Sequence, residues 1–518
     1  MTIRLLPFAV LASLVAGDGL FISVPGFAPG HASEAVPRDL TSFSIEFSSF
    51  PDYAGNKSDP NHFSHALLSN LKDITGVSSK IRVGGTTQDH ALFYPDQVEA
   101  IKLVFEEPGA DQPSTVQYGP AYFSTYQAWE GLEFIHGFNF AFNGTSDREQ
   151  LQSVAMAACT SMGDGLYLSE VGNEMDFAPG WPNYYRPSNW TMGDYVTEWT
   201  SKSNLIAQTI EDNCPGVSTG FVAPSFIWTN YTGREPWSPA EAFRLGLGDN
   251  GLVKEIGVHN YMNVDSDTRF GVEGEDLQEL LMNHSSVIGS VGPHVELARN
   301  LSYLGLPYVL SETNSIAGQG RINTTDVMGD ALWVVDFTLW VGANNIKRIH
   351  FHQGTGYRYA SWQPVTINTT QPTTRPPYYG HIMASRALGN SNDTRIVNLP
   401  LPRDTEAAYA IYEKDSLARI AILNMEESTS SATHRAHREY NLRLPKGFCG
   451  AKVERLMAAG SDSRTGITFG GISYDYELAG GKPVVVDETS TETHLSIAED
   501  GRLRLTLPAS SGALVTLF

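Results

Sequence analysis

Two glutamates, Glu174 and Glu312, have the setting expected of catalytic acids. Each ends a short apolar run, "GLYLSEVGNE" and "LPYVLSET", so each lies where a β-strand would end. Two such carboxyl groups can hydrolyse a glycoside, with one held protonated as the acid and the other ionised as the nucleophile. Hydrolysis with retention needs the two carboxyl groups about 5 Å apart. The pair therefore predicts a retaining glycosidase if the fold brings both strand ends to one site.

Two polar residues near these glutamates fit the same chemistry. Asn173 precedes Glu174, and its amide is suited to donate a hydrogen bond to the 2-hydroxyl of a sugar. Tyr261, in "EIGVHNYM", is suited to hydrogen-bond the nucleophile and hold its geometry. The alternative is that both glutamates are buried structural acids in ion pairs. Their joint occurrence on the fourth and seventh strand-like runs favours the catalytic interpretation.

The elements that must position these residues are eight strand-like runs that alternate with helix-like or irregular stretches. This alternation predicts parallel βα units, and eight of them predict an α/β fold, the (β/α)8 TIM barrel. Active-site residues of such a barrel lie at the C-terminal ends of its strands. The runs cover residues 42–47, 79–85, 132–140, 165–174, 217–224, 255–262, 306–313 and 346–354, and the clearest helical patterns cover 147–162 and 191–213.

The pattern changes after about residue 390, where short alternating runs are separated by Gly, Pro, Asp and Ser turns. These runs predict an antiparallel β-sandwich. The expected organisation is a signal peptide at 1–17, an N-terminal segment at 18–37, a catalytic barrel at 38–389 and a β-sandwich domain at 390–518. The early run "LFISVP" (20–25) is expected to add a strand to the sandwich.

The segments "FSIEF", "RVGGTTQD", "EVGNEMD", "VHNYM" and "LSETNS" resemble, in this order, glycoside hydrolase family 79, the family of β-glucuronidases and heparanase. Related barrels share the Asn-Glu pair, so the specificity comes from its combination with "RVGGT" and "SETNS". The resemblance implies Glu174 as acid/base, Glu312 as nucleophile and Tyr261 as the partner of the nucleophile. It also implies that Glu46 and Thr86 contact the sugar.

The resemblance further implies that the loop after the nucleophile binds the carboxylate of a uronic acid, partly through backbone N–H groups. The loop here reads "SIAGQG", which assigns this role to Gly318 and Gln319. A tyrosine after the eighth strand is expected to assist, and Tyr357 is preferred to Tyr359.

The sequence departs from the family pattern at two positions. Met175 follows the acid where many relatives have Pro, which bears on the shape of that loop. Ala317 stands where some relatives place a Tyr, which bears on binding of the uronate.

Other patterns carry weaker signals. His350 and His352 alternate on one strand and so face one side, and lining of the site is favoured over a metal site because no third ligand is evident. The "RVGGTTQD" segment lacks the strand-to-helix phosphate fingerprint, which disfavours a nucleotide site. No cofactor and no metal are expected. Five tryptophans in predicted loops fit either sugar platforms or loop packing: Trp181, Trp190, Trp228, Trp237 and Trp362.

The 518 residues include 35 basic and 57 acidic residues, a formal net charge of −22. This balance argues against nucleic acid and long polyanionic ligands, because both need basic surfaces. It is equally consistent with solubility in an acidic medium. The expected partner is a carbohydrate substrate, with no nucleic acid and no membrane, and the oligomeric state stays open.

The N-terminus has the form of a secretory signal. Arg4 precedes "LLPFAVLASLVAG", which is long enough for a signal peptide and too short to span a membrane, and Ala16 and Gly17 suit a nearby cleavage site. Together with many Asn-x-Ser/Thr sequons, this start predicts a secreted, extracellular glycoprotein. The sequons lie at Asn56, Asn143, Asn189, Asn230, Asn283, Asn300, Asn323, Asn368 and Asn392.

Three cysteines cannot form a disulfide framework, and at most one pair can close. Cys159 and Cys214 flank the same predicted strand and could face each other from neighbouring helices. Cys449 is then expected to be a lone, buried thiol.

These observations together predict a secreted retaining β-glucuronidase that removes terminal β-linked glucuronic acid, or its 4-O-methyl form, from plant-type glycans. An endo-acting, heparanase-like enzyme is the first alternative, and the charge of −22 disfavours it because a sulfated chain would be repelled. A non-catalytic carbohydrate-binding barrel is the second alternative. Both glutamates, with Asn173 and Tyr261, disfavour it.

Overall fold

The computed structural model describes residues 21–106, 112–179, 186–229, 231–232, 236–264, 277–491 and 493–518. Within them, eight parallel strands close into a barrel in the order β10-β11-β14-β15-β16-β2-β5-β9. The eight predicted runs and the predicted barrel are therefore confirmed. The strands are β2 (Thr41–Glu46), β5 (Ile81–Gly84), β9 (Phe134–Phe138), β10 (Leu166–Val171), β11 (Phe221–Phe226), β14 (Val253–Val264), β15 (Tyr308–Ala317) and β16 (Ile349–Gln353).

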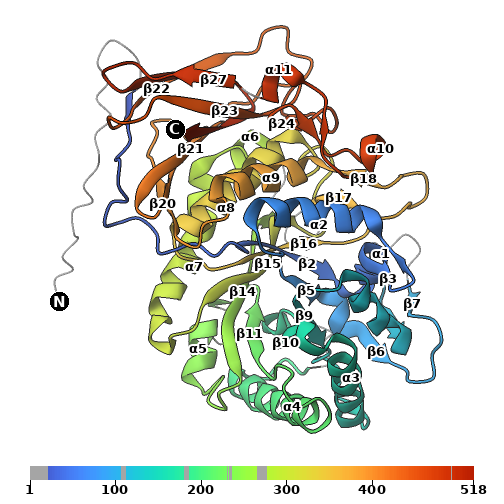
Figure 1. Cartoon of the computed structure of the whole chain (residues 1–518). Coiled ribbons are helices and arrows are strands. Elements are labelled where there is room, and N and C mark those ends of the chain that lie inside the picture. The colour runs from blue at the N-terminus through green and yellow to red at the C-terminus, as the bar shows by residue number, and fades with distance from the viewer. Residues whose placement is uncertain are drawn as a thin grey trace, which may run out of the picture.

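Helices cover the outside of the barrel (Figure 1). The longer ones are α2 (His62–Thr75), α3 (Asp147–Met162), α4 (Met192–Asn213), α5 (Pro239–Arg244), α7 (His284–Asn300), α8 (Met328–Ala343) and α9 (Pro376–Leu388), and the short ones are α1 (Phe50–Ala54) and α6 (Leu277–Leu280). Two further short helices, α10 (Tyr476–Ala479) and α11 (Glu488–Thr491), belong to the C-terminal part of the chain. The helical patterns at 147–162 and 191–213 correspond to α3 and α4. Thr191 caps α4 in a reciprocal capping box with Asp194, which explains why that helix begins at Met192.

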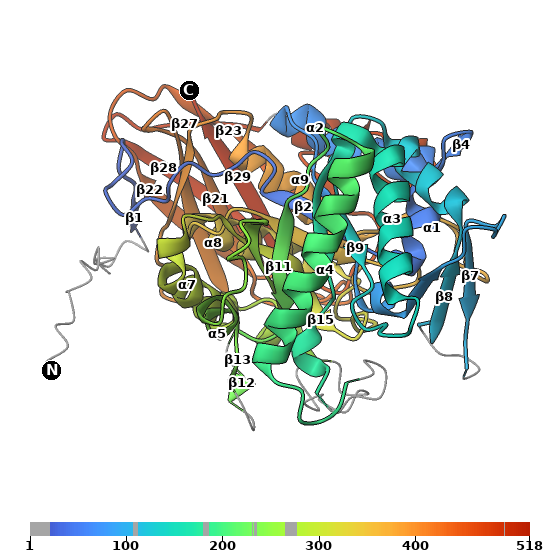
Figure 2. The same ribbon diagram turned by 90° about the horizontal axis from the view of Figure 1, so that it is seen from below.

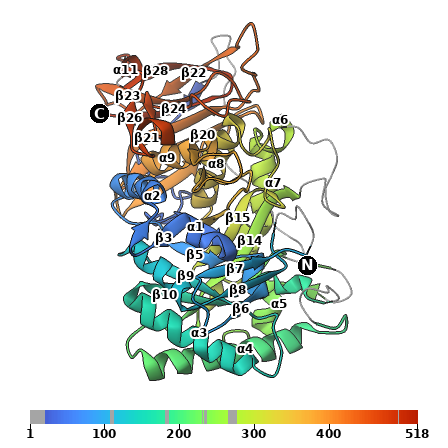
Figure 3. The same ribbon diagram turned by 90° about the vertical axis from the view of Figure 1, so that its right-hand side faces the viewer.

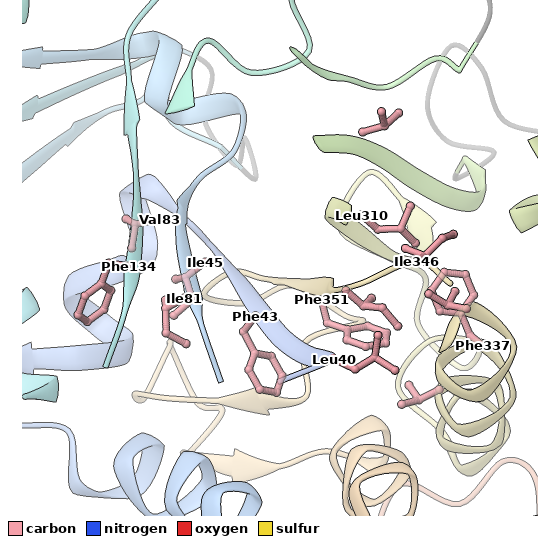
Figure 4. Packing of buried hydrophobic residues seen from close by; sticks show 14 of the residues in the cluster. Leu40, Phe43, Ile45, Ile81, Val83, Phe134, Leu310, Phe337, Ile346 and Phe351 are labelled. Atoms are coloured by element: carbon pink, nitrogen blue, oxygen red, sulfur yellow. The ribbon is translucent and has the colours of Figure 1, made fainter. Parts of the chain in front are cut away.

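Alternation along the strands divides the barrel into an apolar outer layer and a more polar interior. Figure 4 shows Phe43, Ile45, Ile81, Val83, Phe134 and Phe351 among the buried apolar side chains of the barrel strands, with Phe351 close to Phe337 of α8. On the same strands, Ser44 and Arg82 point inward, because successive side chains face opposite sides of a strand. Inside, a small apolar cluster of Ile135, Leu168, Val222 and Val309 lies among these polar groups.

A three-stranded sheet extends from the side of the barrel between β5 and β9 in the chain. It consists of β6 (Ala91–Phe93), β7 (Ile101–Val104) and β8 (Thr115–Tyr118), in the order β6-β8-β7 (Figure 2). Gln112 lies just before β8 and reaches back to the barrel mouth, where it hydrogen-bonds Tyr357. The segment just before β8 therefore contributes to the site although it is no part of the barrel.

The C-terminal residues form two sheets that pack face to face on the far side of the barrel from α3 and α4 (Figures 1 and 3). The larger sheet contains β19 (Thr394–Asn398), β20 (Glu406–Glu413), β21 (Ser416–Asn424), β23 (Gly450–Met457), β24 (Thr468–Phe469), β25 (Ile472–Ser473), β26 (Val484–Val485), β27 (Thr493–Ser496) and β29 (Ser511–Leu517). The smaller sheet contains β1 (Phe21–Ser23), β22 (His437–Arg443) and β28 (Arg502–Pro508). The two sheets enclose an apolar core, which is the predicted antiparallel sandwich.

The strand β1 belongs to the sandwich although it precedes the barrel in the chain. It runs parallel to β22, with Phe21 opposite Asn441 and Ser23 opposite Arg443. Ile22 is buried in the sandwich core. Phe21–Ser23 of the predicted run thus adds a strand to the sandwich, while the predicted signal peptide at 1–17 lies outside the described residues.

The cysteines agree with the sequence prediction in one respect and differ in another. Cys159 of α3 and Cys214, at the end of α4, form a disulfide with a Cα–Cα distance of 6.1 Å. Cys449 is exposed, so the expectation of a buried thiol is wrong. The reason is its place in the turn before β23, where its backbone N–H donates to the carbonyl of Phe518 and its side chain is exposed.

Candidate active site

A cavity of about 700 Å³ opens at the C-terminal ends of the barrel strands. Nine residues were predicted to form the site, and eight of them line this cavity: Glu46, Thr86, Glu174, Tyr261, Glu312, Gly318, Gln319 and Tyr357. The ninth, Asn173, lies fully buried next to Glu174 in the chain. The fold therefore gathers residues from six different strand ends or the loops after them.

The backbone after β10 turns sharply to present Glu174. Gly172 has φ 83°, and a Cβ there would lie 2.7 Å from Met175 and 2.8 Å from Phe140, so only glycine fits. Glu174 itself is left-handed, with φ 52°, and its N–H donates to the carbonyl of Ser225 at 2.9 Å. Met175, which departs from the family pattern, is fully buried and fills the space beneath this turn.

Glu312 lies on β15 and is held by two donors. The hydroxyl of Tyr261 donates to Oε1 at 2.7 Å, and Nη1 of Arg82 donates to Oε2 at 2.5 Å. The hydrogen bond expected between Tyr261 and the second glutamate is therefore present. Single ligand atoms of Glu174, His259 and Glu312 all lie within 4.8 Å of one another, so the two carboxyl groups are close enough for the retaining reaction.

The two carboxyl groups have opposite electrostatic surroundings. Burial, and then the negative charge of Glu312, raise the pKa of Glu174 to about 8. Burial also acts to raise the pKa of Glu312, but the positive charges of His352 and Arg82 outweigh it and hold that pKa below its usual range. One proton shared by the pair therefore resides on Glu174, which leaves Glu312 ionised.

Arg82 connects the residues of the site but was not singled out in the sequence. Its side chain is fully buried and donates to Glu170 at 2.9 Å, to Glu312 at 2.5 Å and to Oδ1 of Asn173 at 2.7 Å. Arg82 lies within the predicted strand at 79–85, and alternation along that strand puts its side chain on the same face as Gly84. The positive charge of Arg82 is thus fixed between Glu170 and Glu312. Arg82 is not among the residues that line the cavity.

A second cluster lies on the opposite wall, around Glu46. Its Oε1 accepts a hydrogen bond from the N–H of Thr87 at 2.9 Å, and its Oε2 accepts one from the hydroxyl of Tyr357 at 3.1 Å. Gln112 donates to that hydroxyl at 2.7 Å. Thr86 lines the cavity as predicted, while Thr87 is the residue that holds Glu46.

Asn173 is fixed from two sides below the cavity. Its N–H donates to Asp89 at 2.6 Å, and its Oδ1 accepts from Arg82. Its Nδ2 is buried and has no hydrogen-bond partner among the described residues. A buried amide donor without a partner is costly, which is consistent with a donor kept for a substrate hydroxyl.

The loop after β15 has an unusual backbone. Gly318, Gln319 and Gly320 have φ values of 72°, 72° and 79°, all in the left-handed region. Their three carbonyl oxygens accept hydrogen bonds from Arg358, through Nη2, the backbone N–H and Nε respectively. Arg358 therefore engages all three carbonyl oxygens. The donors that the loop can offer to an anion are its backbone N–H groups and the side-chain amide of Gln319.

Residues 408–514 match the glycosyl hydrolase family 79 C-terminal beta domain. The chain is 40% identical to a β-glucuronidase of Aspergillus niger, over 96% of this chain and 94% of that protein. It is 36% identical to a β-glucuronidase of Neurospora crassa, over 95% of this chain and 96% of that protein. The chain belongs to glycoside hydrolase family 79. The resemblance seen in the sequence is therefore confirmed.

Solved structures agree with this membership of family 79. A 4-O-α-L-rhamnosyl-β-D-glucuronidase from Fusarium oxysporum matches with a TM-score of 0.80 and 25% identity, over 96% of this chain and 100% of that one. A family 51 α-L-arabinofuranosidase from Bifidobacterium longum matches with a TM-score of 0.59 and 14% identity, over 96% of this chain and 98% of that one. The second likeness concerns the fold alone.

The histidines of this family 79 chain divide between the site and the barrel interior. His352 lines the cavity and lies 3.6 Å from Oε2 of Glu312, whereas His350 is fully buried against the carbonyl of Phe43. The expectation that both line the site is therefore wrong for His350, which lies one layer deeper on the same inner face. His259, which lies at a predicted strand end but to which the sequence assigns no role, places Nδ1 2.9 Å from Oε1 of Glu174.

Glu174, His259 and Glu312 are spaced closely enough to hold a metal ion. Arg82 already donates to Glu312 from 2.5 Å and places a positive charge beside it. A second cation there would be repelled, so the cluster fits the acid pair of a glycosidase better than a metal centre.

The tryptophans are also divided. Trp190, Trp237 and Trp362 are buried and pack the core, which is the loop-packing alternative. Trp228 is 38% exposed and lines the cavity, as expected of a sugar platform. Trp181 lies outside the described residues.

The pKa shifts in this family 79 site predict a pH profile. With a poor leaving group, we expect kcat/KM to fall as the pH rises through the pKa of Glu174, about 8, because only its protonated form can act as the acid. On the acid side, activity should persist below the ordinary carboxyl range, because Glu312 stays ionised there. The pH dependence of kcat/KM for an alkyl glucuronide measures both limits. A basic limb that persists in Glu174→Ala would assign the titration to another group.

Proposed function

We propose that the chain is a retaining β-glucuronidase that removes terminal β-linked glucuronic acid, or its 4-O-methyl form, from glycans. The observation that carries this proposal is the pair Glu174 and Glu312, with carboxyl atoms within 4.8 Å and opposite pKa shifts. The β-glucuronidases that resemble it over nearly its whole length support the choice of sugar.

The reaction proceeds in two displacements. Glu312 attacks the anomeric carbon while Glu174 donates its proton to the glycosidic oxygen, so the bond to the leaving group breaks as an ester to Glu312 forms. Glu174, now ionised, then removes a proton from a water molecule. This water attacks the anomeric carbon and releases Glu312. Two inversions give net retention.

The surrounding residues prepare the pair for this sequence. Arg82 and Tyr261 keep Glu312 ionised and oriented, since each donates to a different oxygen. The amide of Asn173 serves the sugar 2-hydroxyl, where a hydrogen bond strengthens as positive charge develops on the ring. His259, at 2.9 Å, positions the carboxyl of Glu174.

Recognition of the uronate depends on neutral donors. None of the described residues that line the cavity is a lysine or an arginine. The sugar carboxylate is met instead by the N–H groups of Gly318 and Gln319, by the Gln319 amide, and by the Tyr357 hydroxyl when it turns from Glu46 to the sugar; all three residues line the cavity. An anion buried without such partners would be costly. Ala317 supplies no hydroxyl here, which leaves these groups to carry the selectivity.

The proposed function predicts strong selectivity at C6 of the sugar. Hydrogen bonds to a charged group contribute roughly 1.5–3 kcal/mol each, so two or three of them amount to several kcal/mol. We expect kcat/KM for an aryl glucuronide to exceed that for the matching glucoside by at least about 10³, at about 1.4 kcal/mol per tenfold. Aryl glycosides that differ only at C6, as carboxylate, hydroxymethyl or hydrogen, measure this ratio.

Gln319→Ala and Tyr357→Phe are each expected to narrow the ratio and to leave any glucoside hydrolysis nearly unchanged. Tyr303→Phe, an exposed tyrosine far from the cavity, is the matched control. A wild-type protein that cleaves glucosides or xylosides as well as glucuronides would rule out the uronate pocket and leave the two-glutamate mechanism standing.

We also propose that the protein is secreted and N-glycosylated. Six sequon asparagines are exposed: Asn143, Asn189, Asn300, Asn323, Asn368 and Asn392. Asn56 and Asn283 are half-buried, and Asn230 lies outside the described residues. The Cys159–Cys214 disulfide supports an oxidising compartment. No described helix is long and apolar enough to cross a membrane.

A further inference from the structure

The cavity has two chemically different walls. Glu46, Gln112 and Tyr357 give one wall a hydrogen-bonded polar surface, which suits a sugar with many hydroxyl groups. On the other side, the loops after β10 and β11 contribute Phe177 and Trp228. Phe177 comes three residues after Glu174, the residue that protonates the leaving group, so this apolar wall adjoins the acid.

The aromatic wall is built into the site. The rings of Phe177 and Trp228 meet edge to face, with centroids 6.0 Å apart. Asp176, between Glu174 and Phe177 in the chain, accepts hydrogen bonds from the N–H of Trp228 at 2.9 Å and the N–H of Ile227 at 3.3 Å. The Glu174 N–H is joined to the same loop through Ser225. The position of Trp228 is therefore coupled to the backbone that carries the acid.

We propose that Trp228, supported by Phe177, forms a leaving-group subsite that stacks on the C–H face of a hexopyranose ring. This inference rests on the proposed function, because it takes Glu174 as the acid and places the leaving group beside it. An exposed indole ring would bury apolar area against the C–H face of a sugar, and aromatic faces suit rings with one apolar side. The substrate class is then a glucuronic acid linked to another pyranose rather than to a small alcohol.

Asp176 is a positioning residue in this arrangement. It touches no substrate, but its carboxyl fixes the two N–H groups that aim the Trp228 loop. Its loss would release the platform without removing any group that meets the sugar. Glu174 lies only two residues before Asp176 in the chain. A test of Asp176 therefore needs a readout that separates loss of the Trp228 platform from damage to the catalytic acid.

The test compares two substrates that need the acid equally but differ in the leaving ring: methyl β-glucuronide and a glucuronosyl-β-1,6-galactose disaccharide. In Trp228→Ala, kcat/KM for the disaccharide should fall at least about tenfold, equivalent to about 1.4 kcal/mol, while that for methyl glucuronide stays near wild type. Trp228→Phe should restore most of the loss. Tyr303→Ala, an exposed aromatic away from the cavity, should change neither.

Asp176→Ala should reproduce the same split between substrates, and Asp176→Asn, which retains one acceptor oxygen, should recover part of it. The subsite is overturned if both substrates fall together, which would mean damage to the acid, or if the disaccharide is cleaved as well by Trp228→Ala as by the wild type. If the wild type cleaves neither glucuronide, the proposed function itself fails, which is a distinct outcome.

Discussion

Replacing Glu312 by glutamine is expected to lower kcat by at least about 10³-fold, because the amide cannot form the ester to the sugar. The glutamine can still accept the hydrogen bond from Tyr261, so the pocket keeps its shape. Its loss of charge removes one of the two acids that hold Arg82, but Glu170 remains at 2.9 Å. The expected defect is therefore chemical rather than structural, and steady-state kinetics with an unchanged melting temperature measure it.

The smaller variant Glu312→Gly tests the role more directly. Added azide or formate can enter the space and attack from the same side, so activity should return with an inverted product. Glu255→Gln is a suitable control, because Glu255 is equally buried on β14 but binds Arg348 and Tyr167 away from the cavity. It should keep kcat near that of the wild type. Substantial activity in Glu312→Gln would refute the assignment of the nucleophile.

Replacing Glu174 by alanine should have an effect that depends on the leaving group. For alkyl and disaccharide glucuronides, loss of acid assistance costs about 10²–10⁴-fold in rate. For 2,4-dinitrophenyl glucuronide, whose leaving group needs no proton, the first displacement should stay fast. The second displacement should slow, because Glu174 also activates the water, so a burst of dinitrophenol should precede slow turnover.

Azide should accelerate the slow step in Glu174→Ala and yield a glucuronosyl azide with retained configuration. His259→Ala serves as the comparison, because it removes the neighbour 2.9 Å from Glu174 but leaves the carboxyl in place. Its loss of activity should be smaller, and the basic limb of its pH profile should shift. If activated and poor leaving groups lost equal activity in Glu174→Ala, the acid/base role would be wrong.

The sequence predicts the barrel well because outward-facing apolar residues and inward-facing polar residues alternate along its strands. Phe43 and Ile45 pack outside and Ser44 points inside, a two-residue period that is visible without coordinates. The strand ends then locate Glu174, Tyr261 and Glu312, because parallel strands bring their C-terminal ends to one mouth.

What the sequence could not provide are contacts between residues distant in the chain. Arg82 looked like an ordinary strand residue, and only the closed barrel shows that it bridges Glu170 and Glu312. Gln112 lies just before a strand of the side sheet, and no local signal in the sequence shows that it meets Tyr357. The placement of His350 below His352 likewise depends on how many layers the barrel interior holds.

The pairing of β1 with β22 has a consequence for how the chain is made. Phe21 leaves the ribosome before any barrel strand, but its partner Asn441 follows only after all the barrel strands, β2 to β16, have been synthesised. Domains generally fold as units during synthesis, so the barrel can close while β1 is still unpaired. Until β22 and β28 arrive, Ile22 has no core to enter and the edge of β1 stays open. A chain that is stalled or truncated before residue 437 would carry the catalytic barrel preceded by an unpaired strand β1. Chaperones and proteases act on exposed, unpaired strands of this kind.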